Sequence, residues 1–160
     1  MKQKYLFHGS SELFTILDPS KCFDNPKLAY ATDSWAYALV RAGKQGIYIR
    51  EDYHGLNKPM ELAELFPNAF LDMFECKGYV YLFDPKDFVK VGNEYVTDKP
   101  VIPVDIKVID NVWYWMRNAT ADGVYDFYYY DDEEYWRQVN GGREGYLVRK
   151  VLRSILFEAE

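Results

Sequence analysis

Three short segments of the chain place a polar or aromatic side chain at the end of an apolar run. In chain order they are His8-Gly9-Ser10, Tyr30-Ala31-Thr32 and Glu94-Tyr95-Val96-Thr97. A carboxylate can stabilise a developing positive charge on a sugar ring, and an aromatic ring can stack on a ligand. A glycine lets a ligand approach the backbone closely. These groups suit cleavage of a glycosidic bond whose leaving group departs neutral, which needs one positioned carboxylate rather than the pair that ordinary glycosidases use.

Each segment taken alone also has a purely structural explanation. A histidine after a strand is often a turn residue, a tyrosine in a strand often packs in a core, and a glutamate in a polar strand is usually solvated. The ordered combination is what favours a ligand site. Glu94 is preferred over the other central glutamates because it follows a clear strand. The competitors are Glu51, Glu61, Glu64 and Glu75, of which the last three fall in a region with helical spacing.

The elements that would position these groups are short strands and separate helices. Runs of aromatic, aliphatic and β-branched residues predict strands at residues 5–7, 28–32, 46–50, 78–83, 94–97 and 101–112. Asp33 or Ser34 would cap a helix over residues 35–42. Residues 60–76 predict two short helices interrupted at Pro67. Without a regular βαβ alternation, this pattern indicates the α+β class.

The character of the sequence changes after residue 112. Residues 124–139 and 145–158 predict helices joined by a Gly-Gly pair, so we expect a core over residues 1–112 and a helical C-terminal extension over residues 113–160, packed on the same domain. The acidic aromatic run 126–136 would then be an amphipathic helix with a solvated face. It would alternatively present a surface to a basic partner or a second subunit.

Composition limits the classes of function. The 160 residues fit one domain, and the net charge of −6 disfavours generic binding to nucleic-acid phosphates. Two cysteines, Cys22 and Cys76, and two histidines without a CxxC pair disfavour a structural zinc site, so we expect free thiols and no metal. His54 is expected to be a solvated turn residue. No signal-peptide core and no apolar run near the roughly 20 residues of a membrane span are present, so we expect a cytoplasmic protein without a membrane partner.

The ordered motifs resemble the His-Tyr-Glu branch of the ADP-ribosyltransferase fold, which includes the diphtheria toxin and poly(ADP-ribose) polymerase types. They are also similar to small bacterial single-domain relatives of that fold, over residues 4–112. The resemblance implies a split β-sandwich of two small, mostly antiparallel sheets with peripheral helices. It implies an enzyme that moves ADP-ribose from NAD to an acceptor and releases nicotinamide. The acceptor could be a protein, a nucleic acid or a small molecule.

The resemblance also implies a role for each motif residue. His8 would hydrogen-bond the ribose next to adenine, and the backbone of Gly9 would bind the nicotinamide carboxamide. Tyr30 would stack on the nicotinamide ring. Glu94 would be the catalytic residue, bonding the hydroxyls of the nicotinamide ribose and stabilising its oxocarbenium-like cation. Ser10 and Thr32 lie within the same motifs and would complete the set of NAD-binding residues.

Three other functions are compatible with these residues. The first is a binding module on the same fold that recognises NAD or ADP-ribose without catalysis. The second is an interaction protein whose working part is the acidic aromatic run 126–136. The third, transfer of a 2′-phosphate from RNA to NAD, is disfavoured because few basic residues lie near the motifs. Arginine is a disfavoured acceptor, since the branch that modifies it carries Glu or Gln where this chain has Gly92.

Overall fold

The computed structural model describes residues 4–21, 27–119 and 123–158. Its strands are β1 (Leu6–Ser10), β2 (Ala29–Ala31), β3 (Ile49–Asp52), β4 (Met60–Glu64), β5 (Gly78–Phe83), β6 (Val89–Val91), β7 (Glu94–Thr97), β8 (Asp105–Ile109) and β9 (Tyr125–Tyr128). Its α-helices are α1 (Trp35–Arg41), α2 (Ala69–Phe74), α3 (Val112–Ala119), α4 (Glu133–Arg137) and α5 (Gly142–Glu158). Short 3-10 turns cover Pro19–Lys21 and Pro85–Asp87. Cys22 lies outside the described residues, and Cys76 is a free thiol.

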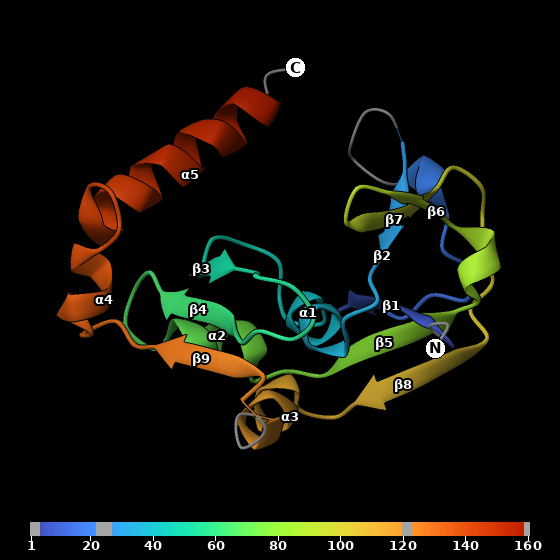
Figure 1. Ribbon diagram of the computed structural model, residues 1–160, viewed down its shortest axis with the longest axis horizontal. Helices are drawn as coiled ribbons and strands as arrows, with labels where there is room; N and C mark the ends of the chain where they lie inside the picture. Colours follow the sequence, from blue (N-terminus) through green and yellow to red (C-terminus); the bar gives the residue numbers. More distant parts are fainter. Residues whose placement is uncertain (1–3, 22–26, 120–122, 159–160) are drawn as a thin grey trace.

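The α+β class is confirmed, but the strands form three sheets rather than two. Within the described residues each sheet has three strands, in the orders β1-β5-β8, β2-β7-β6 and β3-β4-β9. All of the pairings are antiparallel except that of β4 with β9. In Figure 1 the sheet of β3, β4 and β9 is on the left, the other two sheets are on the right, and α1 is near the centre of the molecule.

The first sheet is built around β5, the strand most clearly predicted by the sequence. Five of its six residues are buried, as expected for a strand covered on both faces. His8 of β1 lies opposite Tyr81 of β5, and Gly9 lies opposite Val80. The strand predicted for residues 101–112 is confirmed in a shorter form as β8, which pairs with the other edge of β5.

The second sheet joins two of the motif segments. Tyr30 of β2 lies opposite Val96 of β7. A hairpin turn with Gly92 at φ 63° connects β6 to β7, a conformation that glycine adopts without strain. The backbone of Thr32 exchanges hydrogen bonds of 2.7 and 2.8 Å with Phe7, which links this sheet to β1. The predicted strands at residues 28–32 and 94–97 are therefore neighbours in space.

Helix α1 covers the first sheet and forms where it was predicted. The Ser34 side chain caps it by accepting a hydrogen bond from the Tyr37 backbone N–H at 3.1 Å. Its buried residues form the main core with α2, α3 and the centre of the third sheet. The helix lies so close to β1 that a Cβ atom built on Gly9 would be 1.7 Å from the Ala38 carbonyl oxygen.

Residues 60–76, predicted as two helices, instead form β4 and the single helix α2. β4 is the central strand of its sheet and buries four of its five side chains, so its sequence lacks the alternation of a half-exposed strand. The buried Glu64 carboxylate at its end accepts hydrogen bonds of 3.0 Å from the backbone N–H groups of Phe70 and Tyr130. These bonds tie the C-terminal region to α2.

The prediction of a helix over residues 124–139 is also wrong. This segment forms β9, which pairs in parallel with β4, followed by a turn and the short helix α4. The acidic aromatic run 126–136 is therefore part strand, part turn and part helix rather than one amphipathic face. The expected boundary between residues 112 and 113 falls at the start of α3.

Helix α5 confirms the helix predicted near the C-terminus and begins slightly earlier than expected. Its first turns pack against α4, where the rings of Trp136 and Tyr146 lie 6.4 Å apart. Its later turns project away from the sheets (Figure 1) and expose apolar side chains, including Val148, Leu152 and Ile155. Among the helices of the described residues, none combines the length and the apolar character needed to cross a membrane.

Candidate functional site

His8 is held between the first two sheets by the backbone of the second motif. Its Nδ1 atom lies 2.7 Å from the carbonyl oxygen of Tyr30. The ring is flanked by Phe14 and Tyr81, whose centroids lie 5.9 and 6.3 Å away. The structure therefore brings the first and second motifs into direct contact.

This contact fixes the chemistry of the imidazole. A carbonyl oxygen only accepts hydrogen bonds, so Nδ1 carries the proton and donates it to Tyr30. Burial lowers the pKa of His8 below its ordinary value of 6.5, although the bond to the Tyr30 carbonyl acts in the opposite direction. The neutral imidazole is thus favoured, and its Nε2 atom is an acceptor.

The groups that Gly9 can offer to a ligand are its backbone N–H and C=O. The Phe7 N–H and C=O point to β2 and bond Thr32. Because backbone groups alternate in direction along a strand, the N–H and C=O of Gly9 point to the same side. In the described parts of the chain, the hydrogen bonding between β1 and β2 stops at the Phe7–Thr32 pair, since His8 takes the Tyr30 carbonyl. Among the described residues, the N–H and C=O of Gly9 therefore have no hydrogen-bond partner at this edge.

Tyr30 and Glu94 lie on the same face of the second sheet. Ala29 and Ala31 are buried, whereas the intervening Tyr30 is 38% exposed. Tyr30 lies opposite Val96, and Glu94 lies two residues before Val96, hence on the same face. Such diagonal neighbours are about 7–8 Å apart.

Glu94 itself is exposed at the hairpin between β6 and β7, opposite Val91. No hydrogen bond or ion pair holds its carboxylate among the residues that the structure describes. The structure therefore places it near Tyr30 without fixing its direction. Of the predicted site residues, His8, Gly9 and Tyr30 are the ones that the structure brings together.

Ser10 and Thr32 have local structural contacts. The Ser10 hydroxyl accepts a hydrogen bond from the backbone N–H of Glu12 at 3.0 Å, which closes the turn after β1. The Thr32 hydroxyl accepts one from the backbone N–H of Ser34 at 3.1 Å, just before α1. Both side chains shape the turns that hold the motif strands.

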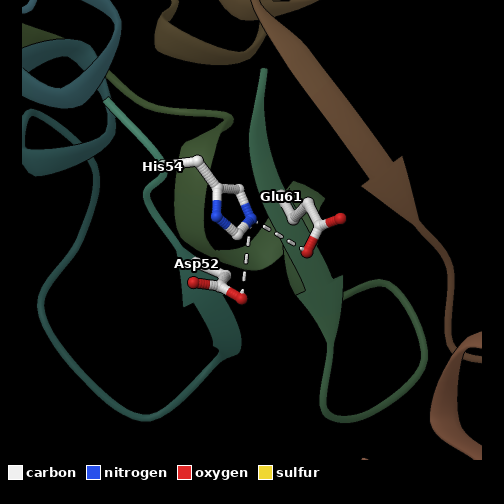
Figure 2. A group of neighbouring side chains, drawn as sticks. All are labelled: Asp52, His54 and Glu61. Carbon is white, nitrogen blue, oxygen red and sulfur yellow. Dashed lines mark ion pairs between the residues drawn. The ribbon is translucent and has the colours of Figure 1, made fainter. Parts of the chain in front are cut away.

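A second constellation lies on the hairpin of β3 and β4. The Nε2 atom of His54 lies 3.6 Å from Oδ2 of Asp52 and 3.4 Å from Oε2 of Glu61. Figure 2 shows the imidazole pointing between the two carboxylates. The sequence predictions separate these residues, because they make His54 a solvated turn residue and place Glu61 in a helix. Asp52 and His54 are two residues apart, the spacing of one strand face, and this was the available signal.

Asp52 and Glu61 also line a cavity of about 350 Å³. Its other lining residues are Arg50, Tyr128, Asp132, Glu134, Tyr135, Gln138 and Val139. A smaller cavity of about 210 Å³ lies near the start of α1 and includes Ser34, Tyr53 and Lys58. Neither of these two cavities includes His8, Tyr30 or Glu94.

In comparisons with protein-family models, curated proteins and solved structures, no match to this chain was found.

Proposed function

We propose that this chain is an NAD-dependent ADP-ribosyltransferase that releases nicotinamide and moves ADP-ribose to an acceptor. The observation that carries the proposal is the end of the backbone pairing between β1 and β2 at the Phe7–Thr32 bridge. Beyond it the His8 side chain donates a hydrogen bond to the Tyr30 carbonyl at 2.7 Å, and no described residue of β2 pairs with the backbone N–H and C=O of Gly9.

The free groups of Gly9 complement a primary carboxamide. The N–H can donate to the carboxamide oxygen, and the C=O can accept from its NH₂ group. The exposed ring of Tyr30 lies on the neighbouring strand and offers a stacking surface to the attached aromatic ring. Nicotinamide carries both a carboxamide and an aromatic ring, so this pair of residues would clamp the leaving group.

The neutral His8 would bind a sugar. With Nδ1 committed to Tyr30, Nε2 can accept a hydrogen bond from a ribose hydroxyl. The flanking rings of Phe14 and Tyr81 hold the imidazole in place. His8 would therefore position NAD and take no proton during the reaction.

Glu94 would act on the reacting bond. As the bond between ribose C1′ and the nicotinamide nitrogen breaks, its electron pair stays with the departing neutral nicotinamide. The carboxylate would stabilise the cation that remains on the ribose. The acceptor then forms a bond to C1′, and its proton passes to Glu94 or to water.

Incubation of the full chain with NAD labelled in nicotinamide tests the proposal. We expect release of nicotinamide, and a fall of about 100- to 1000-fold in the Glu94→Gln variant because one electrostatic contact to the transition state is lost. NAD affinity should stay within about tenfold, roughly 1.4 kcal/mol. The matched control is Glu75→Gln, which removes an exposed carboxylate next to α2. Equal losses of binding and turnover in Glu94→Gln would contradict the assigned role.

A non-catalytic NAD or ADP-ribose module is the second candidate. It is favoured by the free position of Glu94, whose carboxylate is oriented by no described residue. It predicts binding of NAD by calorimetry, no release of nicotinamide, and no effect of Glu94→Gln. A chain that neither binds NAD nor releases nicotinamide would contradict both candidates.

A further inference from the structure

The β3–β4 hairpin sets two carboxylates directly against each other. Asp52 and Glu61 are partners in the antiparallel register. Like charges at opposite positions destabilise a strand pair, so this arrangement calls for a positive group between them. The imidazole of His54 points into that position (Figure 2), with 3.6 and 3.4 Å from Nε2 to the two carboxylate oxygens.

These distances match the separation between two ligand atoms that bind the same metal ion. Zinc binds imidazole nitrogen and carboxylate oxygen at about 2.0–2.2 Å, so two ligands at a tetrahedral angle lie about 3.4 Å apart. The three ligand atoms of Asp52, His54 and Glu61 all lie within 4.8 Å of one another. We propose that Asp52, His54 and Glu61 bind a divalent transition-metal ion such as Zn²⁺.

The ligand set indicates the class of ion. One imidazole with two carboxylates suits zinc and its first-row neighbours, whereas calcium and magnesium prefer oxygen ligands alone. Copper(II) would bind more tightly than zinc by the usual order of affinities. Zinc is the simplest probe because it has no redox chemistry of its own.

The surroundings add negative charge. The 350 Å³ cavity next to the three residues is lined by the carboxylates of Asp52, Glu61, Asp132 and Glu134. After burial, the charges of Glu61, Asp126 and Asp132 raise the pKa of the Tyr128 phenol. A cation entering this cavity therefore meets a negative potential.

Arg50 is the one cationic side chain among the residues that line this cavity. Its Nη2 atom lies 3.7 Å from Oδ2 of Asp52, and its Nη1 atom donates to the Tyr135 hydroxyl at 2.5 Å. It offsets only part of the carboxylate charge. Three protein ligands leave a fourth position of a tetrahedral ion for water or another small ligand. Since Asp52 and Glu61 border the cavity, this position would be reached from there.

The metal site is independent of the proposed NAD site. His54 follows β3, and Glu61 lies in β4, within the third sheet. His8, Tyr30 and Glu94 belong to the first and second sheets. A failure to bind metal would therefore not contradict the proposed NAD site, and a failure to bind NAD would not contradict the metal site.

Calorimetric titration of the chelator-treated full chain with zinc chloride tests the inference. We expect one zinc ion per chain, and a visible absorption band when Co²⁺ replaces zinc. His54→Gln and Glu61→Gln should each weaken zinc binding about 100-fold, which corresponds to about 2.7 kcal/mol. The matched control is Asp105→Asn, which removes an exposed carboxylate that pairs with Lys107 at 3.2 Å, and its zinc affinity should equal that of the unmodified chain.

The two substitutions remove side chains that are 39% and 30% exposed, so the variants should fold, which circular dichroism would verify. At a given zinc concentration, zinc should also raise the unfolding temperature of the unmodified chain more than that of either variant. No saturable binding at millimolar zinc would overturn the inference. Binding of equal strength in both variants would overturn it as well, since zinc would then be held by other surface carboxylates.

Discussion

The chain contains two His-Gly dipeptides, and the structure gives them opposite surroundings. His8 is flanked by aromatic rings and donates a hydrogen bond to a backbone carbonyl. His54 is exposed and faces two carboxylates. Gly9 has the α1 backbone against it, whereas a Cβ built on Gly55 has no described residue other than its chain neighbours within 4 Å.

The difference shows that the same two residue types serve different physical needs. At Gly9 the missing side chain lets a helix pack on a strand. At Gly55 it permits a backbone with φ 109°, which L residues rarely adopt. The neutral environment of His8 favours recognition of a polar, uncharged group. The anionic environment of His54 favours a cation.

The largest effect is expected from Gly9→Ala. The new Cβ would lie 1.7 Å from the Ala38 carbonyl oxygen and 2.8 Å from the Ala42 nitrogen, both backbone atoms of or next to α1. Because the helix would have to move, we expect the free energy of unfolding to fall by about 3 kcal/mol or more. Urea unfolding measures this change. Ser10→Ala is the control, with a loss of about 1 kcal/mol for its hydrogen bond to Glu12.

Gly55→Ala should have a smaller effect of different origin. Its Cβ meets open space, so only the backbone strain at φ 109° is introduced. Such strain costs about 1–3 kcal/mol. The same urea measurement should therefore give a smaller loss than Gly9→Ala. A loss at Gly55 as large as that at Gly9 would show that the contrast between the two dipeptides is wrong.

The smallest effect is expected in the pH dependence of the free energy of unfolding. Because the pKa of folded His8 lies below 6.5, the unfolded chain takes up a proton in acid before the folded chain does. The free energy of unfolding should therefore fall as pH decreases below 6.5, with a slope no steeper than about 1.4 kcal/mol per pH unit. His8→Gln should remove this component, whereas His54→Gln should retain it. Unfolding curves at pH 7 and pH 5 compare the two variants, and identical pH dependence in both would contradict the assignment to His8.

The elements around His8 could be predicted because their signals are local. The strand at residues 78–83, the cap at Ser34 and the short strand at Tyr30 each show their pattern within a few residues. The contact between the His8 and Tyr30 motifs is implied only by their resemblance to the ADP-ribosyltransferase fold. The free backbone edge of Gly9 could not be predicted, because it arises only when the side chain of His8 takes a carbonyl from the neighbouring strand.

The elements around His54 were mispredicted because their signals are not local. Residues 60–64, Met-Glu-Leu-Ala-Glu, are strong helix formers, and tertiary contacts override that preference. β4 becomes a strand because it fits between β3 and β9. Because the local pattern of residues 60–76 is helical, the sequence does not place Glu61 near His54 and does not predict their cluster with Asp52.

The parallel pairing of β4 with β9 also bears on how the chain folds during synthesis. Met60 of the central strand pairs with Tyr125 of β9, which is synthesised about 65 residues later. The third sheet therefore cannot be completed until β9 has been made. Contacts at such sequence separation form slowly because a long loop must close first. We expect the first sheet and α1 to assemble while the ribosome is still translating. The β3–β4 hairpin would gain its second neighbour only when the last quarter of the chain emerges.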